Sequence, residues 1–258
     1  MLNRVLILLE SESDIDNLLR SGQYFKEKYG AEIYGLHIKD MKKYDPSSKA
    51  VEGIGVGNSA NFFIREWKKL ENEETEDIKI IFKNYFPLDN LLIENGIPND
   101  IILEKMLGFD LIISEINKYI SSIQKGLLKH HYKPVLLIPK NTILNIEKIM
   151  IANNNSEKVN RSIFNFLNMF NQLNKFTSVA VNLNYGTNNE FFNYMKVAKK
   201  TLTSLELEGK ALNIICEKSK EFDILIIGDL KHSFLIENLV GSTGLKLLKK
   251  INIPIYIG

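Results

Sequence analysis

The sequence predicts an α/β protein with two tandem, doubly wound parallel-sheet domains of about five strands each. Three observations predict it: short apolar runs alternate with amphipathic helical stretches, the connections are short, and the second half repeats the spacing of the first. Short apolar runs bounded by polar residues are typical of strands buried on both faces, and strand-helix-strand units form parallel sheets. With 258 residues, 45% of them hydrophobic, the chain has enough apolar material for two cores.

The first half opens with a strand expected at Arg4–Leu9, a continuous apolar run that ends in an acidic, polar turn. The following stretch carries apolar residues at helical spacing, among them Leu18 and Phe25. Gly30 stands where a helix C-cap favours glycine. The next apolar run, Glu32–Ile38, is the second predicted strand.

The first half then carries an excursion at about 41–86 for which the second half shows no counterpart in sequence. It opens as a loop containing Gly53, Gly55 and Gly57 and continues into a helix expected at Ala60–Asn72. The glycine-rich run does not follow a strand and lacks the Gly-Lys-Ser ending of a phosphate loop. It is therefore interpreted as a flexible connection.

The second half begins with the same succession of elements. A strand is expected at Lys148–Ala152, followed by the polar turn Asn153–Ser156. A helix with Val159 and Phe166 on one face comes next, and then a strand at Val179–Leu183.

The two halves match in identity as well as in pattern. Gly96 and Asp110 have the same separation as Gly209 and Asp223, and Glu-Lys and Phe-Asp pairs fall in register between them. Helix amphipathicity explains matching apolar residues, but it does not explain matching charged residues. The sequence therefore predicts an internal duplication.

The boundary between the copies is expected at residues 139–145. Pro139 ends a strand, because proline cannot donate to the hydrogen-bond ladder, and it opens a short linker. Domain 1 is thus expected at 1–140 and domain 2 at 146–258.

A phosphate site is predicted in the second copy, between its fourth strand and the following helix. Gly228 ends a buried strand, and Gly241, Ser242 and Thr243 begin the helix. Ligands of open parallel sheets bind beyond the carboxyl ends of the strands, and a helix start offers unpaired N–H groups. The alternative is an ordinary turn at Gly228 and an ordinary N-cap at Ser242.

The stretch that begins at Gly228 resembles the universal stress protein family. Nucleotide-binding members carry Gly, two residues, Gly, nine residues, then Gly-Ser or Gly-Thr; here the second glycine is Lys231 and the ending is Gly241-Ser242. The stretch Lys148–Ser156 is similar to the family's first strand and its Asp-Gly-Ser turn, with two asparagines in place of Asp and Gly. The resemblance spans the chain except for the excursion.

This resemblance implies an adenine-nucleotide α-hydrolase-like fold and ATP, or a similar adenine nucleotide, in the second copy. It places the ribose near Asn154, the adenine near the backbone around Leu183, and the phosphates on Gly228, Gly241, Ser242 and Thr243. Lys231 disfavours the positive φ that glycine permits, although its ammonium could reach a phosphate. Asn154 lacks the charge that favours a metal ion, which leaves Mg²⁺ open.

The first copy is expected to be a structural partner that binds no nucleotide. Ser114 and Ser121 stand at two glycine positions of the loop, which is shorter than in the second copy. Glu10 and Glu12 at the first turn would repel phosphate.

The remaining candidate residues have ordinary interpretations. Cys216, the one cysteine, is expected to be a small buried hydrophobe. His130 and His131 are adjacent, so they point in different directions from a helix end and make a poor metal pair. His232 beside Lys231 is interpreted as solvated, with a phosphate contact as the alternative.

Two functions stay open. The first is a universal stress protein that binds nucleotide in its second copy in a non-catalytic or regulatory role. The second is a nucleotide-free scaffold whose excursion contacts a protein partner. An enzyme such as a nucleotidyl transferase is least favoured, because no acid, base or metal cluster can be argued from the sequence.

The resemblance further implies that the last strands, Pro134–Ile138 and Pro254–Ile257, pair within the chain or in a homodimer. A net charge of +2 with interspersed lysine and glutamate gives no reason to expect a nucleic-acid partner. No apolar stretch approaches the roughly 18 residues of a membrane span, so a cytoplasmic protein is expected.

Overall fold

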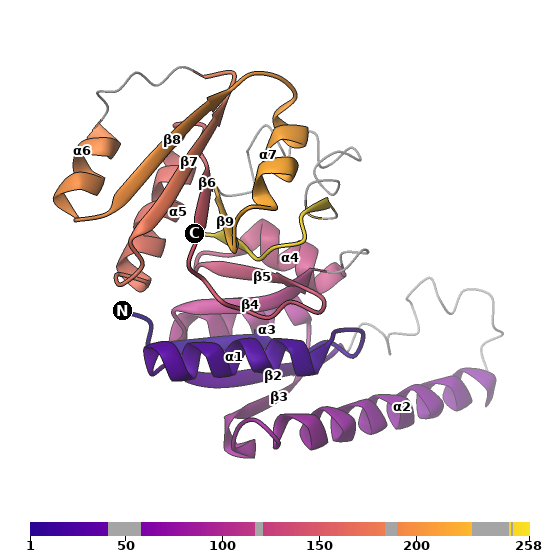
Figure 1. Ribbon diagram of the computed structural model, residues 1–258. Helices are drawn as coiled ribbons and strands as arrows, with labels where there is room; N and C mark the ends of the chain where they lie inside the picture. The colour runs from indigo at the N-terminus through magenta and orange to yellow at the C-terminus, as the bar shows by residue number, and fades with distance from the viewer. Residues whose placement is uncertain (41–57, 117–120, 184–189, 229–247, 249) are drawn as a thin grey trace.

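The computed structural model describes residues 1–40, 58–116, 121–183, 190–228, 248 and 250–258. Within these ranges the chain forms one continuous sheet of ten strands, in the order β3-β2-β1-β4-β5-β10-β9-β6-β7-β8. Helices and strands alternate along the chain (Figure 1). The predicted α/β class with doubly wound parallel sheets is therefore confirmed.

The elements of the first half are, in order, β1 (Arg4–Leu8), α1 (Ile15–Tyr29), β2 (Glu32–Asp40), α2 (Asn58–Phe82), the 3-10 helix η2 (Leu88–Asn90), β3 (Leu91–Gly96), α3 (Pro98–Lys105), the 3-10 helix η3 (Met106–Gly108), β4 (Leu111–Ile116), α4 (Ser122–His130) and β5 (Val135–Pro139). Those of the second half are β6 (Ile149–Ala152), α5 (Glu157–Met169), β7 (Lys175–Val181), α6 (Glu190–Val197), β8 (Thr201–Leu207), α7 (Ala211–Ser219), β9 (Ile224–Ile227) and β10 (Ile255–Ile257).

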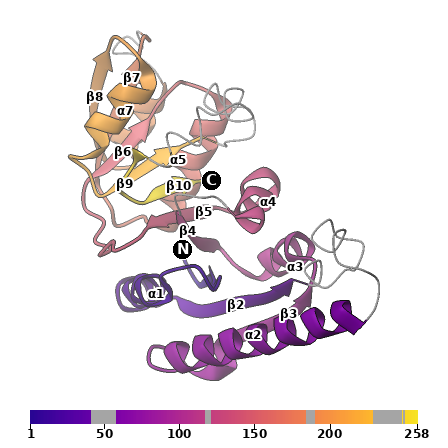
Figure 2. The ribbon, with the colours of Figure 1, turned by 90° about the vertical axis from the view of Figure 1, so that its right-hand side faces the viewer.

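The two halves share one strand order. It reads β3-β2-β1-β4-β5 in the first half and β8-β7-β6-β9-β10 in the second, and every pair within a half is parallel. The halves meet at β5 and β10, which pair antiparallel with Leu136 opposite Tyr256. Figure 2 shows β2 and β3 at one end of the molecule and β7 and β8 at the other. The two halves are therefore joined through their last strands.

Two hydrophobic cores cover the two faces of the sheet. One contains side chains of α1, α2, α5 and α6, and the other contains side chains of α3, α4 and α7. Each core includes residues of both halves, because alternate residues of β5 and β10 point to opposite faces. Phe25 of α1 and Phe170, which follows α5, contact each other with ring centroids 5.9 Å apart. The apolar packing therefore continues across the junction.

Local signals set several element ends as expected. Gly30 ends α1 with a left-handed φ of 69°, and its N–H donates to the carbonyl of Lys26. Asp14 begins the same helix by accepting a hydrogen bond from the backbone N–H of Asn17. In the described ranges, none of the helices combines the length and apolar character that a membrane crossing needs.

The predicted strand at Val179–Leu183 is wrong by several residues, since β7 spans Lys175–Val181. Asn182 ends the strand with a φ of 56°, and its side-chain amide exchanges two hydrogen bonds of 2.8 Å with the backbone of Gly209. A side chain that bonds a distant backbone leaves no local periodicity to detect.

The helix expected at Ala60–Asn72 is longer in the structure, because α2 runs to Phe82. Its later turns bury Ile78 and Phe82 against the sheet. The expectation that the second half has no counterpart to the excursion is wrong for this helix, because α6 connects β7 to β8 as α2 connects β2 to β3. The glycine-rich run of the excursion lies outside the described residues.

Tyr256 lies at the centre of the junction and is fully buried. Its ring contacts Phe166 with centroids 5.0 Å apart. Its hydroxyl is also buried and has no hydrogen-bond partner in the described part of the chain. Burial raises the pKa of Tyr256 above its ordinary value.

We expect Tyr256→Phe to increase the free energy of unfolding by about 1 kcal/mol, because a buried hydroxyl without a partner costs about 1–3 kcal/mol. Urea unfolding measures the change. Tyr132→Phe is the control, since that exposed hydroxyl donates to the carbonyl of Leu103 and its loss brings no gain. A loss of stability in Tyr256→Phe would contradict the prediction.

Candidate functional site

The candidate site lies where the strand order of the second half reverses. From β6 the chain continues to β7 on one side, whereas β9 is followed by β10 on the other. β6 and β9 are parallel neighbours, with Ile149 opposite Ile224 and Ile151 opposite Ile226. Ligands of open α/β sheets bind at such a switch point, beyond the carboxyl ends of the strands.

The turn after β6 is held by the amide side chain of Asn153. Its Oδ1 accepts a hydrogen bond from the backbone N–H of Asn155 at 2.9 Å. Its Nδ2 donates to the hydroxyl of Ser178 in β7 at 3.2 Å, and the residue is only 6% exposed. The buried Asn153 therefore fixes the turn to the neighbouring strand, a role that the sequence analysis missed. An asparagine that bonds the backbone two residues on is the signal that could have indicated it.

Asn155 adopts the left-handed conformation, with a φ of 56°. This is the position at which the resemblance places a glycine, and glycine adopts this conformation without strain. Asparagine tolerates it better than most residues do. The turn thus keeps the backbone shape of an Asp-Gly-Ser turn with different side chains.

The start of α5 follows directly. Ser156 is its N-cap, and its hydroxyl accepts a hydrogen bond from the backbone N–H of Val159 at 3.3 Å. Lys158 lies in the first turn, and its ammonium nitrogen is buried with no hydrogen-bond partner among the described residues. Helix starts favour anions, so Lys158 adds a full positive charge where the backbone already offers a partial one. Lys158 was not predicted from the sequence, since a lone lysine in a first turn carries no motif.

Gly228 brings the end of β9 against the first turn of α5. A Cβ at this position would lie 3.0 Å from the backbone nitrogen of Val159 and 3.3 Å from the Cβ of Lys158. Few Cβ atoms approach a backbone nitrogen so closely, so the contact favours glycine. This contact places the carboxyl end of β9 beside a helix start.

The other predicted site residues divide into two groups. Asn154 and Leu183 follow β6 and β7, which are neighbours, so they lie at the same edge of the sheet as Gly228. Asn154 is exposed, its Oδ1 accepts from the backbone N–H of Ser156 at 3.2 Å, and Leu183 is 42% exposed. The rest lie outside the described residues: Lys231, His232, Gly241, Ser242 and Thr243.

The equivalent switch point of the first half, between β1 and β4, contains a carboxylate of the protein itself. Glu115 of β4 has a fully buried side chain. Its Oε2 accepts a hydrogen bond from the backbone N–H of Asp14, the N-cap of α1, at 2.8 Å. Its Oε1 lies 3.6 Å from the ammonium of Lys140. A nucleotide phosphate at this helix start would have to displace Glu115.

Glu115 is held in place from α4 as well. Gln124 donates from Nε2 to the backbone carbonyl of Glu115 at 2.6 Å. Gln124 also completes a capping box with Ser121, so Ser121 caps a helix and Ser114 is buried beside it. From the sequence, the loss of this site was attributed to the shortened loop with Ser114 and Ser121 and to repulsion by Glu10 and Glu12. The more direct role of Glu115 was not predicted.

The remaining sequence candidates are structural. Cys216 is buried in α7, and burial raises the pKa of its thiol, which confirms its interpretation as a small hydrophobe. His131 is buried at the end of α4, with its Nδ1 3.0 Å from the carbonyl oxygen of Lys133, whereas His130 lies in the exposed last turn. Across the described ranges, no group of three or more His, Cys, Asp or Glu residues is arranged to hold a metal ion.

Comparison with solved structures decides the fold. A universal stress protein from Archaeoglobus fulgidus superposes with a TM-score of 0.68 and 13% identity, covering 99% of this chain and 95% of that chain. The chain has the universal stress protein fold. A protein of unknown function from Pseudomonas aeruginosa gives a TM-score of 0.56 at 14% identity, covering 99% of this chain and 92% of that chain.

A provisionally named universal stress protein from Pseudomonas aeruginosa gives a TM-score of 0.54 at 14% identity, again covering 99% of this chain and 92% of that chain. No family model and no curated protein matches the sequence. At these identities the likeness shows the fold alone.

The left-handed turn gives a test of the site's scaffold. We expect Asn155→Ala to lower the free energy of unfolding by about 1 kcal/mol, because alanine lacks the polar side chain that lets asparagine tolerate this φ, whereas Asn155→Gly stays close to the parent. Thermal and urea unfolding measure both. Asn154→Ala is the neighbouring control, which removes a side-chain hydrogen bond without placing alanine at a positive φ. Equal stability of Asn155→Ala and Asn155→Gly would show that φ does not constrain this position.

Proposed function

We propose that the chain is a small cytoplasmic protein of the universal stress type that binds ATP, or a similar adenine nucleotide, at the switch point between β6 and β9. The proposed role is binding or regulation without catalysis. The observation that carries the proposal is the close approach of Gly228, at the end of β9, to the first turn of α5. A Cβ built at Gly228 would lie only 3.0 Å from the backbone nitrogen of Val159. This contact sets a helix start beside the carboxyl ends of two strands, which suits a phosphate.

Lys158 supports the same proposal. Its buried ammonium is without a hydrogen-bond partner in the described part of the chain, and a buried charge that lacks a partner is costly. A phosphate at the start of α5 would supply that partner through a charge-assisted hydrogen bond. Lys231, Gly241, Ser242 and Thr243 are proposed to complete the phosphate site.

The ribose and adenine are proposed to lie along the carboxyl edge of β6 and β7. Asn154 is exposed there and has an amide group that can donate to a ribose hydroxyl. Leu183 is 42% exposed and offers an apolar contact for the base. Because the turn carries asparagines where the resemblance places Asp and Gly, any Mg²⁺ would be bound mainly by the phosphates.

A nucleotide-free scaffold is the second candidate. The observation that favours it is the hydrogen bond from the backbone N–H of Ser156 to Oδ1 of Asn154, which uses this side chain inside the turn. In that case the first-half connection that contains α2 contacts a protein partner.

Release of bound nucleotide separates the two candidates. We expect protein that is purified under native conditions and then denatured to release an adenine nucleotide, detected by chromatography. At ten times its dissociation constant, ATP should add about 1.4 kcal/mol to the free energy of unfolding. For a chain of this size that is a rise in Tm of about 3–5 °C.

Two variants sharpen the test. Gly228→Ala should weaken ATP binding at least tenfold, because the new Cβ pushes β9 away from the start of α5. Gly108→Ala is the matched control, since its Cβ would meet only the flexible end of Arg4, at 3.2 Å. Urea unfolding of both variants separates loss of binding from loss of folding. No released nucleotide together with no Tm shift at millimolar ATP would overturn the proposal and favour the scaffold.

A further inference from the structure

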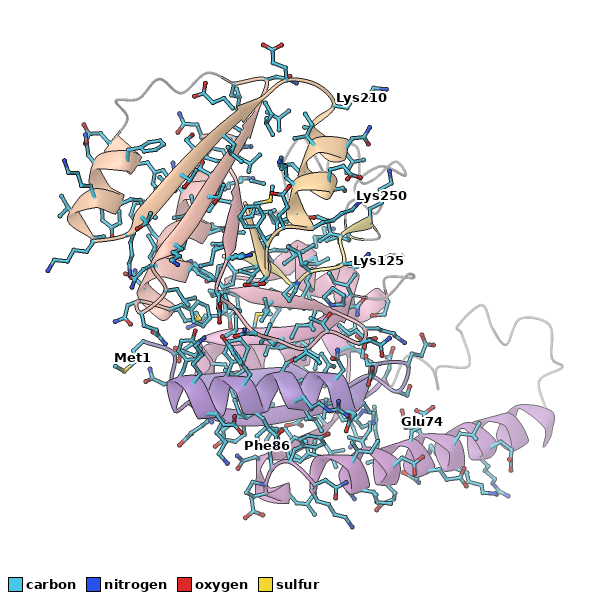
Figure 3. The ribbon with its side chains drawn as sticks, viewed as in Figure 1. Met1, Glu74, Phe86, Lys125, Lys210 and Lys250 are labelled. Atoms are coloured by element: carbon cyan, nitrogen blue, oxygen red, sulfur yellow. The ribbon has the colours of Figure 1, made fainter. Side chains whose placement is uncertain are left out.

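The first half contains a cavity of about 280 Å³ at the carboxyl ends of β1 and β2. Its walls come from the turn after β1, from β2 and from one side of α2, and α3 and α4 contribute apolar side chains. Figure 3 labels Glu74, which points from α2 toward the rest of the first half. The cavity is separate from the proposed nucleotide site, which lies between β6 and β9.

The polar wall of this cavity is strongly acidic. Among the described residues that line it, none is a lysine or arginine, and five carboxylate side chains come from the turn after β1, from β2 and from α2: Glu10, Glu12, Asp40, Glu71 and Glu74. The apolar part of the wall includes Leu36, Ile102 and Ile123. Such a cavity excludes an anion such as ATP and favours a cation that also carries apolar surface.

His37 of β2 adds a second and independent feature. It lines the cavity, it is only 5% exposed, and its Nδ1 lies 3.1 Å from the carbonyl oxygen of Leu9. A carbonyl accepts only, so Nδ1 carries the proton and donates this bond. The other ring nitrogen, Nε2, is buried and has no hydrogen-bond partner in the part of the chain that the structure describes.

The protonation state of His37 determines whether Nε2 donates or accepts a hydrogen bond. Burial holds the pKa of His37 below its ordinary value, against the raising effects of the Leu9 carbonyl, Glu71 and Glu74, while Lys39 lowers it further. The ring is therefore neutral at neutral pH, and Nε2 presents a lone pair. A buried lone pair near the carboxylates of Glu71 and Glu74 favours a ligand that donates N–H groups and carries positive charge.

The arrangement of the carboxylates favours an organic cation over a metal ion. In the described ranges no three metal-binding side chains converge on one point, and these acids are distributed around the cavity. A chain of methylene groups with ammonium groups at intervals matches this pattern, because each ammonium meets a carboxylate while the methylenes contact the apolar wall.

We propose that this cavity binds an aliphatic diamine or polyamine, with one nitrogen donating to Nε2 of His37 and the others paired with Glu71, Glu74 and the acids of the turn after β1. The site does not depend on the nucleotide site, so the failure of one proposal leaves the other standing.

Calorimetric titration of the full chain with spermidine tests the proposal. We expect saturable binding of one spermidine per chain. The double variant Glu71→Gln/Glu74→Gln should bind at least tenfold more weakly. Its control is Glu73→Gln/Glu76→Gln, which removes the same charge from the exposed side of the same helix and should stay within twofold of the parent.

The ¹⁵N chemical shift of the His37 ring shows whether the amine binds beside it. The chain has four histidines, so ¹⁵N-labelled histidine gives a short list of ring signals. Spermidine should shift Nε2 of His37, and ATP at equal concentration should leave it unchanged. The proposal is overturned if spermidine does not bind saturably, if both double variants lose affinity equally, if Mg²⁺ at matched ionic strength binds the cavity as well, or if Nε2 of His37 does not respond.

Discussion

The antiparallel pairing of β5 with β10 is the interaction on which the rest of this structure depends. Each half is a five-stranded parallel sheet whose last strand would otherwise be an apolar edge. Three residue pairs join the edges, from Ile255 opposite Leu137 to Ile257 opposite Val135. An unpaired edge of this kind invites association with other chains, and pairing within the chain removes it. The pairing also brings the helices of the two halves into common cores.

The two halves place different residues beside the same switch point. In the second half a glycine brings β9 against the start of α5, and Lys158 adds positive charge there. In the first half Glu115 accepts a hydrogen bond from the N-cap residue of α1, so the protein supplies its own anion. Both helix starts favour negative charge, so the residues beside them determine whether that charge comes from the protein. The small net charge of +2 is therefore compatible with a local excess of carboxylates in the cavity of the first half.

The sequence predicted the kinds and order of elements well, because apolar periodicity reports burial directly. It predicted the end of α1 at Gly30 because a left-handed C-cap is a local property of glycine. It misplaced β7, whose end depends on a hydrogen bond between Asn182 and the distant Gly209. It also treated α2 as part of an excursion, because the short α6 shares its position in the fold without sharing its pattern.

The residues that shape the two sites were harder to predict for the same reason. Asn153, Glu115 and His37 are each defined by a partner or a burial that arises only after strands distant in sequence become neighbours. Asn154 was identified through a resemblance, whereas the adjacent Asn153 proved to be the buried residue that holds the turn. Motifs indicate where the backbone comes close to a ligand, but the charge that a site presents is fixed by the tertiary neighbours.

The shared core also constrains how the two sites can move. α1 and α5 begin at the two switch points. Phe25 of α1 contacts Phe170, which follows α5, and Phe166 of α5 contacts Tyr256 of the junction. Aromatic side chains that are packed this closely resist small displacements, since interiors have crystal-like density. A ligand that shifted the start of α5 would have to do so against a core that also fixes α1. Both helix starts are therefore held in place by packing.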